Sequence, residues 1–387
     1  MSVNQALAQV SGDFLIAALV IYSLAVLAFA GDFAFGRPSR AAAGAARDKA
    51  VAAERVAELS AVGAAGTAGA ASTVSGAVTG DATVGGAVGG TVGGAAAGDA
   101  GAAVVDGAVP PAGAAPARGL PSRRQSAFRA IWEAGPWVRA AVTLSAIGIL
   151  AHLVAVVTRG YAVHRAPWGN MYEFVTALTC VAAIFFGYVV VRYRAWALGV
   201  FVMGAVVVAL GLAETVIYTA AGPLVPALQS YWLSIHVTAM TLATGIFFVA
   251  AVLGIMYLVA ERYRARVAAG KAPDGNGLLA RIPSSAQLDK LTYRTVVFGF
   301  PIWTFGVIAG AIWADQAWGR YWGWDPVETW AFITWVLYAS YLHARATAGW
   351  RGRRAHYIQL LGFVSLTFNM LVVQIFITGM HSYAGVH

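Results

Sequence analysis

Charged residues and cysteine are both scarce in this chain. Charged residues make up 11% of its 387 residues, whereas a soluble domain carries about 25%. Because 59% of the residues are hydrophobic, the composition excludes an ordinary soluble protein and predicts a protein that lies in a bilayer.

The only cysteine, Cys180, lies inside an apolar run. It can form neither a disulfide framework within the chain nor a thiolate metal cluster, and we interpret it as a small buried apolar residue. A cleavable signal peptide is also not indicated, since no basic segment precedes the first apolar run, which Asp13 opens.

Long apolar runs predict membrane-spanning helices. A span needs about 20 mostly apolar residues, and eight segments meet that requirement. They are residues 14–31, 137–158, 171–191, 196–218, 231–260, 295–313, 329–348 and 356–380. The predicted fold class is therefore an all-α, polytopic membrane protein with about eight transmembrane helices.

The segment between the first two predicted spans, residues 36–130, is rich in alanine and glycine and has few large side chains. Such a segment cannot bury enough surface to offset its ordering entropy, so we predict a disordered linker. A short helix near residues 48–59 and a ninth, weak span are the competing interpretations. The predicted division is an N-terminal helix in 1–35, the linker in 36–130 and a membrane domain in 131–387.

Lysine and arginine are distributed unevenly between the two sides of the predicted membrane domain. With the N-terminus outside, all but three of the 26 Lys and Arg residues fall on the inner side, as the positive-inside rule requires for a cytoplasmic membrane. The exceptions are Arg159, Arg165 and Arg320. This distribution places the linker in the cytoplasm and both termini outside. It also accounts for the net charge of +9 without nucleic acid as a partner.

Tryptophan is concentrated between the sixth and seventh predicted spans, on the outer side. Residues 318–330 read Trp-Gly-x-Tyr-Trp-Gly-Trp-Asp-Pro-x-Glu-Thr-Trp, within an external Trp-rich segment that we place at 314–330. An aromatic belt at the membrane interface explains one or two rings per helix end. Four Trp residues among glycines and carboxylates favour a platform for a planar, apolar ligand, formed by Trp318, Trp322 and Trp324.

Two histidines lie at the same predicted depth as this platform. His236 opens the fifth predicted span at its outer end, and His381 closes the eighth at its outer end. Each alone could be a polar residue at the interface. Together, beside the Trp segment, they predict a bis-histidine site for haem iron, with the aromatic rings against the porphyrin face.

A third histidine, His343, lies deeper in the predicted membrane domain. It follows Trp330 by 13 residues, which places it about 20 Å below the outer face. An imidazole at that depth is a functional candidate, but neither His152 nor His356 matches its depth. If His343 ligates a second haem, its partner ligand is expected from another chain.

Other polar residues near the outer face have structural as well as functional interpretations. Asp325, Pro326 and Glu328 read as the beginning of a helix, with Asp325 as the N-cap. Because this cap fixes where the Trp-rich loop ends and so aims the platform, we also count Asp325 among the cofactor-binding residues. The three outer arginines could meet haem propionates, or be ordinary surface residues. Five further outer residues belong either to a polar network beside the haem or to solvated loops, and we assign no specific function to them. They are His164, Glu173, Glu214, Asp315 and His387.

The Trp-rich motif and the outer histidines resemble the tryptophan-rich "WWD" domain of haem-handling membrane proteins. Within them, the chain is most similar to the CcsA/ResC type of cytochrome c assembly protein, called CcsB in some bacteria. The resemblance covers about residues 137–387. Its motifs are residues 167–173 (Pro-Trp-Gly-Asn-Met-Tyr-Glu), 231–237 (Tyr-Trp-Leu-Ser-Ile-His-Val), 318–330 and 381–383 (His-Ser-Tyr).

The resemblance implies a function in cytochrome c biogenesis. It implies haem b as the bound group, with His236 and His381 as external ligands and His343 as an intramembrane ligand whose counterpart lies on a ResB-type membrane partner. Such a complex, a haem lyase, attaches haem to the Cys-x-x-Cys-His motif of apocytochrome c. A thioredoxin-like protein that reduces the cysteine thiols is a further expected partner, and no protein nucleophile is expected.

Two other functions remain open from the residues alone. A small-solute transporter gated by the aromatic loop would bind no chromophore. A haem-b electron-transfer subunit would carry two histidine pairs at two depths within one chain, which the depths of His152 and His343 do not suggest.

Overall fold

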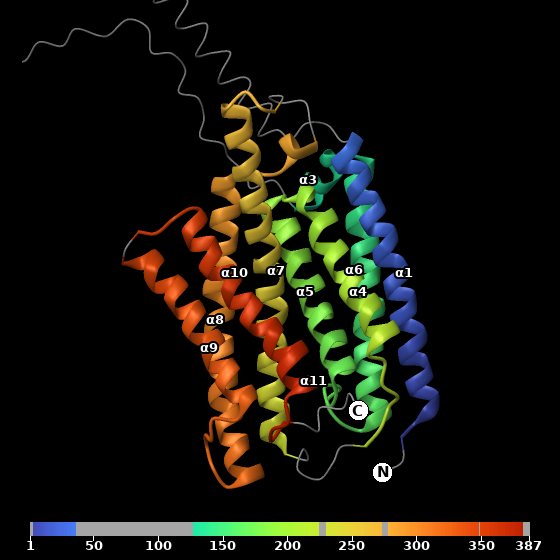
Figure 1. Ribbon diagram of the computed structural model, residues 1–387. Coiled ribbons are helices and arrows are strands. Elements are labelled where there is room, and N and C mark those ends of the chain that lie inside the picture. The colour runs from blue at the N-terminus through green and yellow to red at the C-terminus, as the bar shows by residue number, and fades with distance from the viewer. Residues whose placement is uncertain (1–2, 36–126, 224–229, 273–277, 348, 382–387) are drawn as a thin grey trace, which may run out of the picture. The chain divides into compact units, whose positions relative to one another are not determined.

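A computed structural model describes residues 3–35, 127–223, 230–272, 278–347 and 349–381 of the chain. The described residues form a helical bundle without strands (Figure 1). The predicted linker at 36–130 lies outside the described residues, except for its last four residues, which belong to a short helix, α3. The segment that could hold a helix or a ninth span also lies outside them.

Each of the eight predicted spans coincides with a helical segment. Seven of these segments are long and apolar enough to cross a membrane, so the chain is an all-α, multi-pass membrane protein. They are α1 (Gln5–Phe35), α4 (Pro136–Val163), α5 (Met171–Tyr193), η1 with α6 (Trp196–Leu198 and Gly199–Val216), α7 (Tyr231–Ala268), α8 (Ser285–Trp318), and α10 (Arg353–Phe368) continued by the π-helix η4 (Asn369–Val373) and α11 (Gln374–Phe376).

The seventh predicted span is helix α9, Pro326–Ala346. It is long enough to cross a membrane, but it is less hydrophobic than the other seven segments of the described chain. The reason is its polar side chains, several of which are buried. The shorter helices of the described chain are α3 (Ala127–Ala134) and η3 (Leu278–Arg281).

Local signals explain where the helices begin and end. The side chains of Asn170, Ser230 and Ser284 accept hydrogen bonds from the backbone N–H groups at the beginning of α5, α7 and α8, as N-cap residues do. Helix α8 ends at Trp318, and the φ of 71° at the next residue, Gly319, lies in the left-handed region that glycine adopts freely. This end releases the chain into the Trp-rich loop.

Two buried clusters hold the bundle together. The first joins α1 and α4–α6 to one side of α7, and the second joins the other side of α7 to α8–α10. Helix α1 packs along α4, and α7 packs along α8. Close approach depends on glycine, since a Cβ at Gly148 would lie 2.6 Å from the Tyr22 ring; small residues serve this purpose at many membrane helix contacts.

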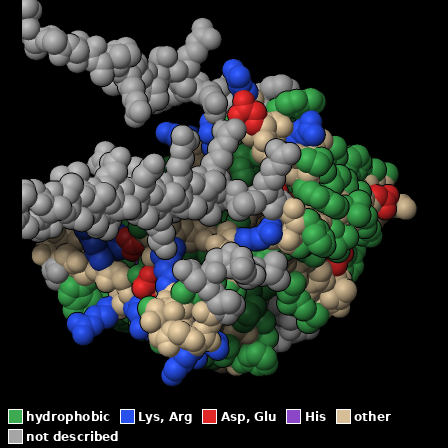
Figure 2. Space-filling model, turned by 90° about the horizontal axis from the view of Figure 1, so that it is seen from above, with side chains coloured by type: hydrophobic (Ala, Val, Ile, Leu, Met, Phe, Trp, Pro, Cys, Tyr) green, Lys and Arg blue, Asp and Glu red, His purple; other side chains and the backbone are tan. Residues whose placement is uncertain are grey.

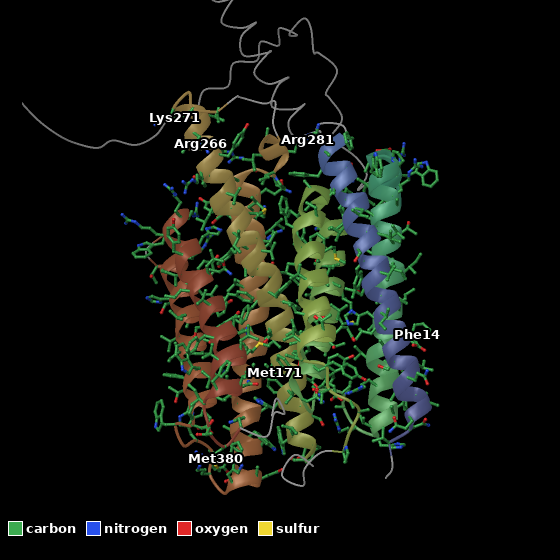
Figure 3. All side chains as sticks on the ribbon, turned by 45° about the vertical axis from the view of Figure 1, so that its right-hand side comes forward. Phe14, Met171, Arg266, Lys271, Arg281 and Met380 are labelled. Atoms are coloured by element: carbon green, nitrogen blue, oxygen red, sulfur yellow. The ribbon has the colours of Figure 1, made fainter. Side chains whose placement is uncertain are left out.

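The two ends of the bundle differ in charge. Arg266, Lys271 and Arg281 lie at one end, and Met380 lies near the other (Figure 3). A view onto the first end shows Lys and Arg side chains gathered there, with fewer Asp and Glu (Figure 2). The ends of α8 and α11 and the beginning of α9 lie together at the opposite end (Figure 1). This arrangement fits the predicted inner and outer faces, although the orientation in a membrane stays a prediction.

Candidate functional site: a tryptophan-lined pocket with two histidines

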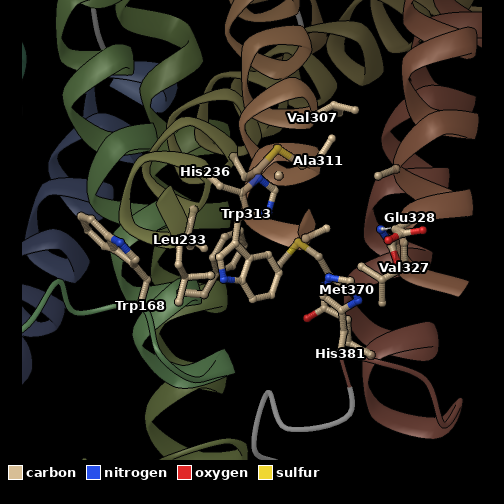
Figure 4. Close-up of a pocket in the computed structure, with 18 of the residues that line it drawn as sticks. Trp168, Leu233, His236, Val307, Ala311, Trp313, Val327, Glu328, Met370 and His381 are labelled. Carbon is tan, nitrogen blue, oxygen red and sulfur yellow. Dashed lines mark hydrogen bonds between the residues drawn. The ribbon is translucent and has the colours of Figure 1, made fainter. Parts of the chain in front are cut away.

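A large pocket lies toward the end of the bundle that carries the Trp-rich loop (Figure 4). Its empty space, including open solvent at its mouth, is about 1240 Å³. Helices α5, α7, α8 and α9 and segment 366–374 contribute to its wall. Four of the predicted site residues line it: His236, His381, Trp318 and Trp322.

His236 enters the pocket from α7. Its Nδ1 lies 2.7 Å from the carbonyl oxygen of Gly306, so Nδ1 carries the proton and donates, and Nε2 is the nitrogen with a lone pair. A backbone carbonyl on one ring nitrogen is the usual way in which proteins orient a metal-binding histidine. The ring also stacks on Trp313, with centroids 6.2 Å apart and planes 11° apart.

Gly310 sets the position of the His236 ring. A Cβ at this position would lie 2.7 Å from both Cε1 and Nδ1 of His236, closer than real Cβ contacts allow. We therefore expect Gly310→Ala to displace the imidazole and to lower ligand affinity at the pocket by about tenfold or more, comparable with the loss of an outer-sphere partner of a metal ligand. Titration of the purified protein with haem, the ligand that the sequence predicts, measures the effect by absorption.

The matched control is Gly211→Ala in α6, where a Cβ meets nothing within 4 Å. This variant should bind like the wild type. Equal affinity in the Gly310→Ala and Gly211→Ala variants would contradict the assigned position of the His236 ring.

Trp313 joins the two histidines. It is 2% exposed, and its ring centroid lies 6.2 Å from that of His236 and 5.9 Å from that of His381. Trp318 lies 4.8 Å from Trp313 and 5.0 Å from His381, in each case edge to face. The sequence interpretation did not select Trp313, because a Trp inside an apolar run looks like a core residue. The one available signal was its spacing of five residues before Trp318.

The other Trp residues of the loop take different positions. Trp322 lines the pocket. Trp324 lies outside the pocket wall, is 66% exposed and has a φ of 58°, a conformation that bulky residues rarely adopt. Its ring contacts Trp322 and Phe332 edge to face. The Trp residues that line the pocket are thus Trp313, Trp318 and Trp322. Trp324, which was predicted to belong to the platform, packs against Trp322 outside the pocket wall.

Asp325 links the beginning of α9 to His381. Its side chain accepts from the backbone N–H of Val327, as expected for the predicted N-cap. A capping box with Glu328 is also complete. The same carboxylate accepts from His381 Nδ1 at 2.9 Å and from the backbone N–H of Met380 at 2.6 Å. Nε2 of His381 is then the nitrogen that can ligate a metal. This carboxylate–histidine pair is a common second sphere of metal sites.

The hydrogen bonds to Asp325 have a consequence for pH. Burial by itself raises the pKa of this carboxyl group, but the bonds from His381, Met380 and Val327 outweigh it and hold the pKa below the ordinary 3.8. A lowered folded pKa contributes stability that is complete above the unfolded value and is lost as the pH falls through the folded value. The link between α9 and His381 is therefore stable against protonation of Asp325 throughout the neutral range.

The outer arginines are engaged with carboxylates. Glu173, on α5, accepts from Arg159 Nε at 2.9 Å and from Arg165 Nη1 at 2.7 Å. Arg159 and Arg165 also donate to the backbone carbonyls of Thr219 and Gly222. The network fixes the two loops that precede α5 and follow α6. Glu173 thus organises the loop that carries Trp168 to the pocket, and its two arginines are committed to it.

Because the Glu173 side chain is fully buried, removing its charge leaves two cations poorly compensated. We expect Glu173→Gln to destabilise the protein by about 3–5 kcal/mol, the usual cost of breaking a buried pair. The thermal midpoint of the detergent-solubilised protein measures this. Glu133 on α3 forms a surface ion pair with Arg129, whose side chain is 71% exposed. Replacing Glu133 by Gln should change the midpoint little. A Glu173→Gln variant as stable as Glu133→Gln would refute a structural role for the network.

Arg320 lies on the loop itself. Its Nη1 is 3.7 Å from Glu328 Oε2, and its guanidinium carbon lies 5.9 Å from the Trp318 ring centroid. With 33% of the side chain exposed, it is the most exposed of the three outer arginines. It is therefore the best placed of them to meet an anionic group at the mouth of the pocket.

The remaining histidines do not enter the pocket. His343 is exposed on the side of α9 that faces away from the bundle. His152 is fully buried against Tyr22 of α1, and His356 is fully buried against Tyr257 of α7. His164 is exposed and ends α4 in the left-handed conformation. His387 lies outside the described residues.

Comparison with known proteins assigns this architecture to a family. A family model described as "Cytochrome C assembly protein" matches residues 168–381, which is more than half of the chain and includes every residue of the pocket. The chain belongs to the cytochrome c assembly protein family. It is a cytochrome c biogenesis protein of the CcsA type.

Relatives of this family member cover most of its membrane domain. It is 35% identical over 315 residues to the cytochrome c biogenesis protein CcsA of Gloeobacter violaceus, covering 67% of this chain and 89% of the relative. It is 38% identical over 234 residues to CcsA of Guillardia theta, covering 56% and 76%. A solved structure titled "Cytochrome c Heme Lyase CcmF" superposes with a TM-score of 0.46 at 18% identity, over 64% of this chain and 43% of that one.

Proposed function

We propose that this cytochrome c assembly protein binds haem b in the Trp-lined pocket and presents it for covalent attachment to apocytochrome c. The observation that carries the proposal is the pair of imidazoles, His236 and His381, which share Trp313 as a neighbour and line one pocket. Each engages Nδ1 with a protein oxygen, so that Nε2 of each keeps a lone pair that could hold haem iron.

The residues of the pocket fit a metalloporphyrin better than a bare metal ion. Among the described residues, no group of three or more His, Cys, Asp and Glu side chains could hold a metal ion by itself. Two histidines with aromatic walls are the ligand set of a bis-histidine haem. Bound haem would supply the iron and the vinyl groups to which the cysteine thiols add.

The protein's own contribution is positioning and shielding. His236 and His381 would hold the iron, Trp313 and Trp318 would lie beside the macrocycle, and Arg320 is placed to meet a propionate. One of the two imidazoles would have to yield to the histidine of the Cys-x-x-Cys-His motif, and haem would supply the vinyl groups to which the thiols add. Effective concentration and exclusion of water account for the acceleration, and no protein nucleophile is required. In this sense the chain is a subunit of a haem lyase.

His343 has a separate part in the proposal. Its exposed position on α9 suits contact with another membrane protein better than contact with the pocket of its own chain. We assign it as an intramembrane haem ligand whose counterpart comes from a ResB-type partner. The cytoplasmic membrane, with the pocket on the outer face, is the location that the cation distribution supports. A thioredoxin-like reductant would keep the apocytochrome thiols reduced.

The two alternative functions fit the geometry less well. A small-solute transporter does not require two imidazoles whose Nδ1 atoms are both held by protein oxygens. A haem-b electron-transfer subunit requires paired histidines at a second depth, but His152 is buried beside α1 whereas His343 is exposed on α9.

The decisive experiment is coexpression with an apocytochrome c and the ResB-type partner in a host that lacks its own assembly system. Covalent haem on the cytochrome, detected by haem stain after denaturing electrophoresis, is the expected result. Purified protein should also show the absorption spectrum of bis-histidine haem. A protein that is produced in the membrane yet carries no chromophore and yields no holocytochrome would refute the proposal.

A further inference from the structure

Helix α9 has an unusual buried face for a membrane helix. Its buried residues are Glu328, Ala331, Thr334, Tyr338 and Tyr341, and all but Ala331 are polar. Contacts between membrane helices are rich in small residues, and polar side chains such as Ser, Thr, Asn and Gln bond across them. Ionisable residues inside a membrane bundle are costly and often mark ion or proton pathways. The buried face of α9 combines one such residue, Glu328, with a row of hydroxyl groups, and this combination points to a function in addition to haem ligation.

The neighbouring segment meets this face with polar residues of its own. Helix α10 packs against α9 and buries His356, Gln359 and Ser365, and Asn369 of the π-helix η4 continues the row. The two rows touch where Thr334 and Ser365 share a hydrogen bond of 3.0 Å between their hydroxyl oxygens. We name the two rows together the polar seam: Glu328, Thr334, Tyr338, Tyr341, His356, Gln359, Ser365 and Asn369.

The outer end of the polar seam opens into the pocket. Glu328 and Asn369 both line the pocket. Glu328 Oε2 accepts from the backbone N–H groups of Gly323 and Asp325, whereas its buried Oε1 has no protein partner. Asn369 donates to the Val327 carbonyl, and its buried Oδ1 also has no protein partner. Two buried oxygens without a protein partner thus belong to residues that line the pocket.

The inner end of the polar seam reaches the basic end of the bundle. His356 stacks on Tyr257 of α7, with centroids 3.7 Å apart, and its Nδ1 lies 3.8 Å from Asp289 Oδ1 on α8. Asp289 pairs with Arg345 of α9, whose guanidinium also lies 4.7 Å from the Tyr293 ring centroid. Because 18% of the Asp289 side chain is exposed, this ion pair is the point where the seam meets solvent.

Between these ends, the polar seam holds further buried polar atoms that lack a protein partner. They are the hydroxyls of Tyr338 and Tyr341, Nε2 of His356 and both side-chain amide atoms of Gln359. Tyr338 faces Gln359 across the seam, but the pair lacks hydrogen-bond geometry. Leaving such atoms unpaired in a low-dielectric interior is unfavourable, and native proteins satisfy them with ordered internal water.

We propose that the polar seam binds a file of internal water molecules, and that this file carries protons between the inner end of the bundle and Glu328 at the pocket. A proton that arrives on Glu328 Oε1 comes from the adjacent water, which takes one from the next water in turn. No electron moves, and no bond between heavy atoms changes. The seam thus lets the pocket exchange protons with the inner side even when a ligand closes its outer mouth.

Hydration of the polar seam can be tested by radiolytic hydroxyl-radical labelling of the full chain. The internal comparator is Phe247, which is fully buried and stacks on Tyr338 at 3.9 Å. Radicals form from the water present, so Tyr338 and Tyr341 should be modified about tenfold faster than Phe247 if ordered water contacts their hydroxyls. If Tyr338 and Tyr341 are labelled no faster than Phe247, no water contacts their hydroxyls and the proposal is overturned.

Proton movement can be tested without haem in vesicles loaded with a pH-sensitive dye under an applied potential. Vesicles with the wild-type protein should take up protons several times faster than protein-free vesicles, an estimate for a hydrated intramembrane path. The Gln359→Leu variant should lose most of this difference, and Gln287→Leu, outside the seam, should keep it. Wild-type vesicles no faster than protein-free ones would overturn the pathway.

A second variant guards against misfolding of Gln359→Leu. Tyr338→Phe removes one hydroxyl and keeps the ring that stacks on Phe247, so the fold should persist, as size-exclusion chromatography can show. It should slow proton uptake in the same way. If both variants fold and both conduct like the wild type, the polar seam is not the proton pathway.

Discussion

Cytochrome c maturation is expected to fall to background when either His236 or His381 is replaced by alanine. Each residue would supply one ligand to the iron. Among the residues that the structure describes, no other histidine lines the pocket. Loss of a ligand itself should exceed the roughly 10–100-fold cost of disturbing an outer-sphere partner. The measurement is covalent haem on a coexpressed apocytochrome c, normalised to the amount of the variant in the membrane.

His164→Asn is the matched control for these two variants. His164 is an exposed outer histidine with a φ of 54°, and asparagine tolerates that left-handed conformation better than alanine. This variant should mature cytochrome c at the wild-type level. Normal maturation with His236→Ala or His381→Ala would contradict the ligand assignment, because the proposal names no other residue that could replace either imidazole.

The second large effect is expected for Asp325→Asn. Asparagine is as good an N-cap as aspartate, so the beginning of α9 and the amount of folded protein should be preserved. The negative charge beside His381 Nδ1 is lost, which makes the imidazole a weaker donor to iron. We expect haem affinity to fall about 10–100-fold and the iron midpoint potential to rise. Titration with haem and a spectroelectrochemical titration measure the two quantities.

Asp325→Ala separates the two functions of this carboxylate. Alanine removes the helix cap as well, which costs about 1 kcal/mol of stability, so its thermal midpoint should fall whereas that of Asp325→Asn should not. If Asp325→Asn binds haem with the affinity and the potential of the wild type, Asp325 acts only as a helix cap and does not tune the ligand.

The sequence contained enough to predict the location of the pocket. The ends of the apolar runs could be counted, and they placed His236, His381 and the Trp-rich loop at one depth. The structure brings these elements together for that reason. The sequence also predicted that Asp325 is the N-cap of α9, because capping depends on neighbours within one turn.

What the sequence could not supply are contacts between distant segments. The bond from His381 to Asp325 spans 56 positions and depends on how the end of α11 returns to α9. Trp313 and Gly310 resemble ordinary residues of a span until the α7–α8 packing is known. Arg159 and Arg165 looked available for an anionic ligand because their shared carboxylate, Glu173, could not be identified from charge patterns alone.

The two imidazoles of the pocket are secured in different ways, and this difference sets an order of events. His236 belongs to the 38-residue helix α7 and is wedged against Gly310, so its ring has little room to withdraw. His381 stands beyond Phe376, where α11 ends, and depends on the Asp325 carboxylate for its orientation. If both imidazoles hold haem as proposed, His381 is therefore the one that could yield its place to a histidine of the substrate, and His236 is the one that would remain fixed.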